Sequence, residues 1–290
     1  GYGFWQARRF LRKNNPQAIL STGGYASFPV VLAAASLKVP QVVYLPDVYP
    51  GWAVRVSARL AQRAAVSSEK SLGRLPKGKT TVTGYPVRPQ FWLARRAEGR
   101  RRLGLNPEEK VLFVSGASQG SRHLNETVAT NLLGLLELCE VVHLSGRAHE
   151  AKLTELKEGL PTESRSRYHL YGYLHDELPW AMAAADLAVC RAGASVMGEL
   201  PAVGLPAVLV PYPYAGGHQR LNARHLEEKG AAIILEDRNL QREFLPLIGS
   251  LLNDSERLTK MREASQALAR PEAATRIARL LLEVARNNGR

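Results

Sequence analysis

The chain has 290 residues, 45% of them hydrophobic and 22% charged, a balance that is ordinary for a globular protein and excludes a disordered chain. Its length excludes a small disulfide-stapled scaffold and fits two domains of average size better than one large domain. Lys and Arg number 39 against 26 acidic residues, which gives a net charge of +13. Such an excess favours contact with phosphates, whether of nucleotides, nucleic acids or anionic lipids.

Two cysteines, Cys139 and Cys190, lie in apolar runs. We expect buried, reduced thiols and no disulfide framework or Cys-ligated metal, which points to the cytosol. No apolar stretch reaches the roughly 18 to 20 residues needed to cross a bilayer, and no signal peptide is visible. The protein is therefore expected to be soluble or peripheral.

Short β-branched runs alternate with helical stretches along the chain, and this rhythm predicts an α/β fold with parallel, doubly wound sheets. All-α and all-β folds are disfavoured. The expected strands, in chain order, cover residues 17–21, 41–45, 64–67, 80–83, 111–115, 140–144, 168–171, 187–190, 207–211 and 231–235.

Residues 86–107 interrupt this rhythm with P-V-R-P, an Arg-rich helix and G-L-N-P. We therefore expect a first lobe over residues 1–94, a linker over 95–107 and a second lobe over 108–290, whose last helix is a candidate to return to the first lobe. The first lobe begins in mid-helix. It lacks the strand and Gly-rich turn that usually open a dinucleotide-type fold, so it is expected to be incomplete.

Two turns after predicted strands are candidates for holding phosphate. Gly23, Gly24 and Tyr25 end the first strand, although a plain connection is the better interpretation of this turn taken alone. After the strand 111–115, the sequence G-A-S-Q-G forms a strand-to-helix turn whose small residues let the backbone approach a diphosphate at a helix N-terminus. Ligand binding and an ordinary connection are equally good interpretations of this second turn by itself.

Two later segments suit a nucleotide or a sugar. The sequence C-R-A-G-A-S-V-M-G-E at 190–199 ends a strand in a Gly-containing turn and starts a helix with a Ser and a Glu, which presents backbone N–H groups to an anionic or polyhydroxylated ligand. His218, Gln219 and Asn222 fall within one turn of a later helix and offer donors and acceptors for sugar hydroxyls. An ordinary capped helix with polar residues facing water is the alternative for the second segment.

Several catalytic signatures are absent from the sequence. It contains no G-x-x-x-x-G-K-[ST], no G-x-S-x-G, no H-E-x-x-H and no Asp-x-Asp pair that would hold a divalent ion against a diphosphate. We therefore expect no metal and no other cofactor.

Arginines cluster beside large apolar residues twice, at residues 8–12 and at residues 95–102. A basic helix of this kind can lie on an anionic membrane surface. A helix that packs on its own sheet, with its charges in solvent, fits each cluster equally well.

Together these motifs resemble the MurG family of bacterial glycosyltransferases, and the likeness covers almost the whole chain. Weaker pieces are S-T-G-G-Y-A-S-F-P at 21–29 and T-G-Y-P-V-R at 83–88. The most specific pieces are G-A-S-Q-G-S-R at 116–122, C-R-A-G-A-S-V-M-G-E at 190–199, G-L-P-A-V-L-V-P at 204–211 and H-Q-R-L-N-A at 218–223. The resemblance implies a two-lobed GT-B enzyme with a cleft between its lobes. It also implies transfer of N-acetylglucosamine from UDP-N-acetylglucosamine to undecaprenyl-linked lipid I, forming lipid II for peptidoglycan at the cytoplasmic face of the membrane.

The resemblance also implies roles for particular residues. Glu199 would accept hydrogen bonds from the ribose, backbone groups near Tyr173 and Leu174 would contact the uracil edge, and Gln219 would hold the sugar hydroxyls. The implied donor-binding residues are Arg88, Ser118, Gln119, Gly120, Tyr173, Leu174, Gly193, Ala194, Ser195, Glu199, His218, Gln219 and Asn222. Helix N-termini and Arg88 would stabilise the departing UDP without a metal.

On the acceptor side, Gly23, Gly24 and Tyr25 match the family's second glycine loop, which is thought to hold the acceptor diphosphate. The first loop, G-G-T-G-G-H, would precede Gly1, so the sequence is expected to be truncated. The family's H-E-Q-N is replaced by residues 44–47, which leaves Asp47 as the only carboxylate of that stretch. We expect Asp47 to position or deprotonate the acceptor hydroxyl.

Three other functions stay open at this point. A related transferase would glycosylate another membrane lipid, such as diacylglycerol. A non-catalytic subunit would bind the UDP-sugar and need a second chain for turnover. The positive charge also suggests nucleic acid, but no recognisable nucleic-acid module accompanies it, so no specific nucleic-acid partner is expected.

Overall fold

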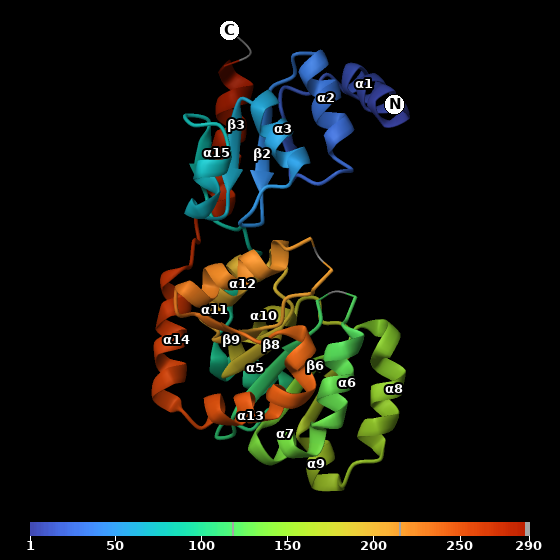
Figure 1. Ribbon diagram of the computed structural model, residues 1–290, viewed down its shortest axis with the longest axis vertical. Helices are drawn as coiled ribbons and strands as arrows, with labels where there is room; N and C mark the ends of the chain where they lie inside the picture. Colours follow the sequence, from blue (N-terminus) through green and yellow to red (C-terminus); the bar gives the residue numbers. More distant parts are fainter. Residues whose placement is uncertain (118, 215, 288–290) are drawn as a thin grey trace. The chain divides into compact units, whose positions relative to one another are not determined.

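The computed structural model describes residues 1–117, 119–214 and 216–287. The chain divides into two α/β units (Figure 1). Unit 1 contains residues 1–87 and the C-terminal segment that begins at Arg270, and unit 2 contains residues 88–269. Each unit has its own parallel sheet, so the prediction of two parallel α/β lobes is confirmed.

The sheet of unit 1 has four parallel strands in the order β1-β2-β3-β4, so neighbours in the sheet are also neighbours in the sequence. Because the strands are parallel, the loops that follow β1 and β2 lie at the same edge of the sheet. The strands are β1 (Ile19–Ser21), β2 (Gln41–Leu45), β3 (Arg63–Val66) and β4 (Thr80–Val82). The helices are α1 (Tyr2–Asn14), α2 (Phe28–Ser36), α3 (Trp52–Leu60), the 3₁₀ helix η1 (Glu69–Arg74) and α15 (Ala273–Asn287).

Helices cover this sheet through small apolar clusters. Leu11 of α1 packs with Ala33 and Ala34 of α2. In a second cluster, Ile277 of α15 packs against Tyr44 of β2 and Ala65 of β3. All five residues of β2 are buried, as expected for a parallel strand with both faces covered.

The sheet of unit 2 has six parallel strands in the order β10-β9-β8-β5-β6-β7. The chain turns to one side of β5 for β6 and β7 and to the other side for β8, β9 and β10. The boundary between β5 and β8 is therefore the topological switch point, where loops diverge and α/β proteins bind ligands. The strands are β5 (Val111–Ser115), β6 (Glu140–Leu144), β7 (Tyr168–Tyr171), β8 (Leu187–Cys190), β9 (Ala207–Leu209) and β10 (Ala232–Ile234).

Helices flank both faces of this sheet, and fully buried side chains such as Leu112, Leu187 and Phe244 form its core. The helices are α4 (Pro89–Leu93), α5 (Arg96–Leu103), α6 (Arg122–Thr130), α7 (Leu132–Leu138), α8 (Arg147–Glu158), α9 (Thr162–Ser166), α10 (Leu178–Ala184), α11 (Val196–Val203), α12 (His218–Glu228), η2 (Asp237–Asn239), α13 (Leu240–Leu252) and α14 (Ser255–Ala267).

The arginine cluster at 95–102 belongs to unit 2. Buried Arg100 donates to Asp186 at 3.0 Å, and Arg96 donates to the other carboxylate oxygen at 2.6 Å. Arg102 lies 3.9 Å from the ring centre of Trp180 on α10. The segment expected to be a linker therefore contains α5, which packs on unit 2. For this Arg-rich segment the structure agrees with the alternative of a helix packed on its own unit, and not with a membrane-facing helix.

All ten predicted strands are present in the described structure, and five have the predicted ends. The others differ by one or two residues. The strand expected at 207–211, for example, ends at Leu209. Pro211 has no N–H for a further ladder bond, which is consistent with the earlier end.

Candidate functional site

A cavity of about 310 Å³ lies at the carboxyl edge of the sheet in unit 2. Its walls come from the ends of β5 and β8, from the turn after β7 and from the first turn of α11. Six of the predicted donor-binding residues line it: Arg88, Tyr173, Leu174, Gly193, Ser195 and Glu199. Ala194 belongs to the same turn as Gly193 and Ser195 but is not among the lining residues.

Glu199 lies in the first turn of α11, directly after the turn that follows β8. Burial raises the pKa of its carboxyl group, while a hydrogen bond from Ser195 and the positive charge of Arg88 act in the opposite direction. A half-buried carboxylate that faces a cavity is a strong acceptor for hydroxyl groups. This geometry suits the two adjacent hydroxyls of a ribose.

Tyr173 and Leu174 follow β7 and form another wall of this cavity. Leu174 is buried, whereas Tyr173 is half exposed and stacks on His175 with ring centres 6.3 Å apart. The guanidinium of Arg147 lies 5.6 Å from the centre of the Tyr173 ring. Gln119 does not line the cavity of about 310 Å³ that contains Glu199, which we call the Glu199 cavity. It lines an adjoining cavity together with Arg147, Ala148, Tyr173 and His175.

The turn after β5 packs tightly against the end of β6. Gly120 has a φ of +74°, and a Cβ at this position would lie 2.1 Å from the carbonyl oxygen of Ser145. Gly146 has a φ of +81° and faces the carbonyl of Gln119 in the same way. Only glycine tolerates both a positive φ and a carbonyl group this close to the position of a Cβ atom. Ser118, predicted to contact the diphosphate or the uridine of the donor, lies outside the described residues.

A buried hydrogen-bond network holds the β6 side of this contact. His143 is completely buried; its Nδ1 pairs with the Tyr168 hydroxyl at 2.8 Å and its Nε2 with Asn125 Oδ1 at 3.1 Å. The amide of Asn125 in turn donates to the carbonyl of Ser145 at 2.8 Å. The network therefore fixes the carbonyl on which Gly120 packs.

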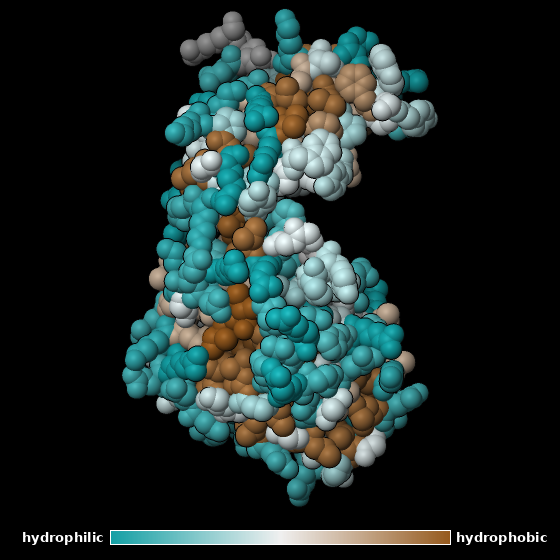
Figure 2. Space-filling view, viewed as in Figure 1, coloured by the Kyte–Doolittle hydropathy of each residue, from teal (hydrophilic) through white to brown (hydrophobic). Residues whose placement is uncertain are grey.

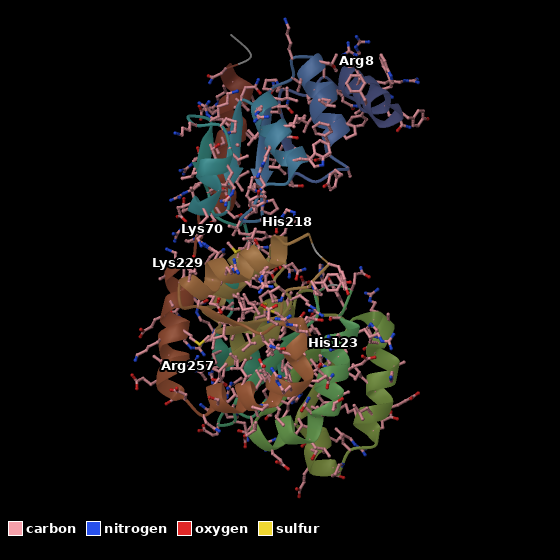
Figure 3. All side chains as sticks on the ribbon, in the orientation of Figure 1. Arg8, Lys70, His123, His218, Lys229 and Arg257 are labelled. Carbon is pink, nitrogen blue, oxygen red and sulfur yellow. The ribbon has the colours of Figure 1, made fainter. Side chains whose placement is uncertain are left out.

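The predicted sugar-binding residues lie at the start of α12, where Figure 3 marks His218. Gln219 Oε1 accepts a hydrogen bond from the backbone N–H of Tyr212 at 2.9 Å. Asn222 is fully buried and donates to the carbonyl of Ala192 at 3.1 Å. Asn222 therefore joins α12 to the turn after β8 and acts as a support, while Gln219 lines a separate cavity of about 510 Å³ together with Gly120.

In unit 1, the glycine turn and Asp47 follow neighbouring strands. Gly23 and Gly24 have φ values of +81° and +83°, and the Ser27 hydroxyl donates to the carbonyl of Gly23 at 2.7 Å. A Cβ on Gly23 would lie 3.6 Å from the carbonyl of Tyr44 in β2. Asp47 comes three residues after Tyr44, so the turn and the carboxylate share one edge of the sheet.

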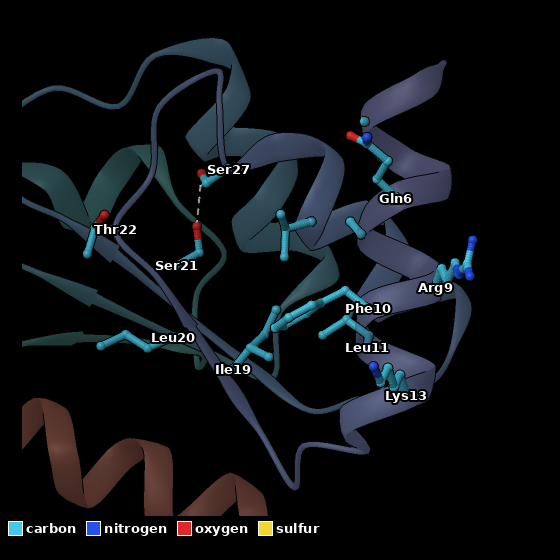
Figure 4. A pocket seen from close by; sticks show the side chains of 13 residues that line it. Gln6, Arg9, Phe10, Leu11, Lys13, Ile19, Leu20, Ser21, Thr22 and Ser27 are labelled. Carbon is cyan, nitrogen blue, oxygen red and sulfur yellow. Dashed lines mark hydrogen bonds between the residues drawn. The ribbon is translucent and has the colours of Figure 1, made fainter.

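A groove of about 860 Å³ adjoins this turn, between α1, β1 and the start of α2. Figure 4 shows Phe10 of α1 beside Ile19 of β1, and the bond between Ser21 and Ser27 at the end of the strand. Tyr25 is 71% exposed, and its ring lies 5.6 Å from that of Trp52. The predicted acceptor residues are therefore accessible beside an apolar groove.

Comparison with protein families gives two matches. Residues 1–66 match the glycosyltransferase family 28 N-terminal domain, and residues 111–277 match the C-terminal domain of that family. A relative from Roseiflexus sp. (strain RS-1) is 42% identical over 96% of this chain and 72% of its own length. The chain belongs to glycosyltransferase family 28.

Other similar proteins agree with this membership. A relative from Halothermothrix orenii is 38% identical over 99% of the chain and 80% of its own length. Both relatives are named UDP-N-acetylglucosamine–N-acetylmuramyl-(pentapeptide) pyrophosphoryl-undecaprenol N-acetylglucosamine transferase. The predicted family and enzyme class are thereby confirmed.

Among solved structures, MurG from Acinetobacter baumannii aligns over 97% of this chain and 77% of its own, with a TM-score of 0.75 at 24% identity. UDP-GlcNAc 2-epimerase from Neisseria meningitidis, solved with UDP-GlcNAc, aligns over 97% of this chain and 80% of its own, with a TM-score of 0.68 at 16% identity. These similarities support the two-lobed fold.

Arg191 lines the candidate site, but the sequence did not predict its contacts. Arg191, at the end of β8, donates from Nε and Nη2 to the hydroxyl of Ser121 at 3.1 and 2.6 Å. Its Nη1 donates to the carbonyl of Val210 at 3.3 Å and to Asp237 at 2.5 Å. Arg191 stands inside the recognised 190–199 motif, but nothing in the sequence pairs it with Asp237, 46 residues away.

None of the helices in the described part of this family 28 chain is long and apolar enough to cross a membrane.

The buried His143 predicts a pH dependence of stability. Burial lowers the pKa of His143 to about 3, whereas an unfolded histidine titrates near 6.5. Between these values the unfolded chain binds more protons, so stability is full above about pH 6.5 and is lost as the pH falls toward 3. We expect His143→Gln to reduce the slope of unfolding free energy against pH, between pH 6 and 4, by up to about 1.4 kcal/mol per pH unit.

Urea unfolding at several pH values measures this slope. Leu133→Ala, at a position 55% exposed on α7, is the control because it leaves the histidine in place. An unchanged slope in His143→Gln would contradict the assignment of a neutral, buried imidazole.

Proposed function

We propose that this chain transfers N-acetylglucosamine from UDP-N-acetylglucosamine to an undecaprenyl-linked N-acetylmuramyl-pentapeptide, the step that forms lipid II. The observation that carries the proposal is the cavity in which Glu199, Arg88 and the Tyr173–Leu174 turn face one another in a family 28 chain. Such a cavity offers a carboxylate for a ribose, a cation for a phosphate and backbone groups with an aromatic ring for a base.

The donor lobe in this proposal is unit 2. Uridine occupies the cavity beside Glu199, and the diphosphate extends over the glycine turn that precedes α6. N–H groups at the start of a helix are orphan donors, and their partial positive charge stabilises phosphate. Arg88 and this helix start would stabilise the departing UDP, so that an acceptor hydroxyl can displace it with inversion at the anomeric carbon.

The acceptor lobe is unit 1. The Gly23–Gly24 turn has positive φ values, and such a turn is suited to the acceptor diphosphate. Asp47, at the same edge of the sheet, is our candidate for the group that positions or deprotonates the acceptor hydroxyl.

We also propose that α1 brings the protein to the cytoplasmic face of the membrane as a peripheral protein. Leu11 packs α1 onto its unit, while Trp5 and Phe10 are 66% and 65% exposed. Arg9, Arg12 and Lys13 are exposed on the same helix. Figure 2 shows hydrophobic side chains over the region of α1 and α2 with hydrophilic ones around them, an arrangement suited to anionic headgroups above an apolar boundary.

The first prediction concerns transfer. With radiolabelled UDP-N-acetylglucosamine, we expect label to enter lipid I and not diacylglycerol, and we expect Asp47→Asn to lower turnover by about 10²–10⁴-fold as for loss of a general base. Label in diacylglycerol alone would favour the related lipid glycosyltransferase. If the chain binds the donor but transfers no sugar until a second chain is added, the non-catalytic subunit is favoured. Normal turnover of Asp47→Asn would remove Asp47 from the mechanism.

The second prediction concerns the ribose contact. Glu199→Ala removes a charged acceptor, so we expect calorimetry to show UDP-N-acetylglucosamine affinity weakened by about 1.5–3 kcal/mol. Glu256→Ala, at a carboxylate that is 79% exposed on α14, is the matched control and should bind as the parent does. Equal affinities of parent and Glu199→Ala would reject the ribose assignment.

The third prediction concerns the membrane. We expect the protein to sediment with vesicles of phosphatidylglycerol and not with phosphatidylcholine, and we expect Arg9→Gln/Arg12→Gln to weaken this binding by about 2 kcal/mol, since each basic residue near an anionic surface contributes about 1 kcal/mol. The control is Lys229→Gln/Arg257→Gln, which changes two exposed cations of unit 2 (Figure 3). Equal losses in the two double variants would exclude a specific role for α1.

A further inference from the structure

The cavity of about 510 Å³ in unit 2 contains a histidine that the sequence motifs do not single out. It lies among the loops that follow β5, β8, β9 and β10. Gly120 and Ser121 contribute from the turn before α6, Gln219 contributes from α12, and His123 contributes from the first turn of α6 (Figure 3). Ala117 and Arg191 line both this cavity and the Glu199 cavity, so the two cavities adjoin.

His123 is held at one ring nitrogen only. Its Nδ1 lies 2.8 Å from Asp237 Oδ2, and its side chain is 38% exposed. Among the described residues, no protein group bonds its other nitrogen, Nε2. A histidine fixed through one nitrogen by a carboxylate presents the other nitrogen in a set direction, the arrangement used for imidazoles that act on a ligand or a metal.

The state of Asp237 decides which way the proton points. Burial acts to raise the pKa of Asp237, but the hydrogen bonds from His123 and Arg191 outweigh it and lower the pKa. An ionised carboxylate only accepts, so Nδ1 of His123 carries a proton. Nε2 is then the atom that faces a ligand, and it donates when the ring takes up a second proton.

The cationic groups around the His123 ring are already paired within the protein, so the ring itself is the group that can bind an anion here. Arg191 is committed to Ser121, Val210 and Asp237, and Arg122 is paired with Glu126 at 2.7 Å. The titratable and charged groups near His123 are thus Asp237 from η2, Arg191 from the end of β8, and Arg122 and Glu126 from its own helix, with Tyr212 and Tyr214 in the same cavity. A phosphate oxygen at Nε2 would accept a hydrogen bond from the ring, whose Nδ1 donates to Asp237 at the same time.

We propose that His123, oriented by Asp237, is a further binding residue for the diphosphate of a nucleoside-diphosphate ligand, and that it contacts the phosphates and not the nucleoside. The proposal rests on the donor-binding function proposed above and adds a residue to it. The glycine turn holds the diphosphate through backbone groups, and His123 adds one charge-assisted hydrogen bond from the first turn of α6, with its ring held by Asp237 after β10.

Comparison of UDP with uridine tests this assignment, because uridine fills only the Glu199 cavity. UDP affinity is measured by calorimetry and uridine affinity by ligand-observed NMR. For His123→Gln we expect a ten- to hundred-fold loss of UDP affinity and unchanged uridine affinity. Asp237→Asn keeps the side-chain volume and should also lower UDP affinity, because Asp237 holds both the His123 ring and buried Arg191. His149→Gln, on α8 and outside the cavity, is the matched control and should bind both ligands as the parent does.

The outcomes separate the possibilities. Unchanged UDP affinity in His123→Gln overturns the inference and leaves the proposed function standing. A parallel loss of UDP and uridine also overturns it, because the residue would then act through the fold. A parent chain that binds neither ligand overturns both the inference and the proposed donor function.

Discussion

The carboxyl edge of the sheet in unit 2 depends on the guanidinium of Arg191. Three of its nitrogens connect the end of β8 with the start of α6, the end of β9 and the segment after β10. A buried arginine is costly unless its donors are satisfied, and here Asp237 and Ser121 satisfy them. Because these loops meet at the switch point of the sheet, one charged group fixes both a wall of the cavity that contains Glu199 and the glycine turn before α6.

A second constraint acts from the other side of β5. Gly120 can approach the carbonyl of Ser145 only because it has no side chain, and the buried His143–Asn125 pair holds that carbonyl in place. The glycine turn is therefore fixed by its packing against the backbone of Ser145 and by the hydrogen bonds of Arg191. A turn that is fixed in this way would lose little conformational freedom if it bound an anion.

The corresponding edge of unit 1 carries exposed aromatic side chains. The Gly23 turn is held by Ser21 and Ser27, while Tyr25 and Trp52 remain exposed beside it. An accessible, aromatic and apolar surface suits a large lipid-linked molecule better than a small soluble one, since a small ligand is usually enclosed by its site. The contrast between the two units follows the contrast between the two substrates proposed for them.

The sequence by itself determined the strands, because buried parallel strands are continuous apolar runs and the turns between them carry Gly and Pro. It also determined family membership through motifs such as residues 190–199. It placed Glu199 at the carboxyl edge of the sheet, because the first turn of a helix that follows a strand must lie there. Only the tertiary structure decided which polar residues face the cavity and which support it: Asn222 turned inward to Ala192, and α5 packed on unit 2 through Arg100 and Asp186. The pairing of Arg191 and His123 with Asp237 was likewise invisible in the sequence, because strand order brings together loops that are far apart along the chain.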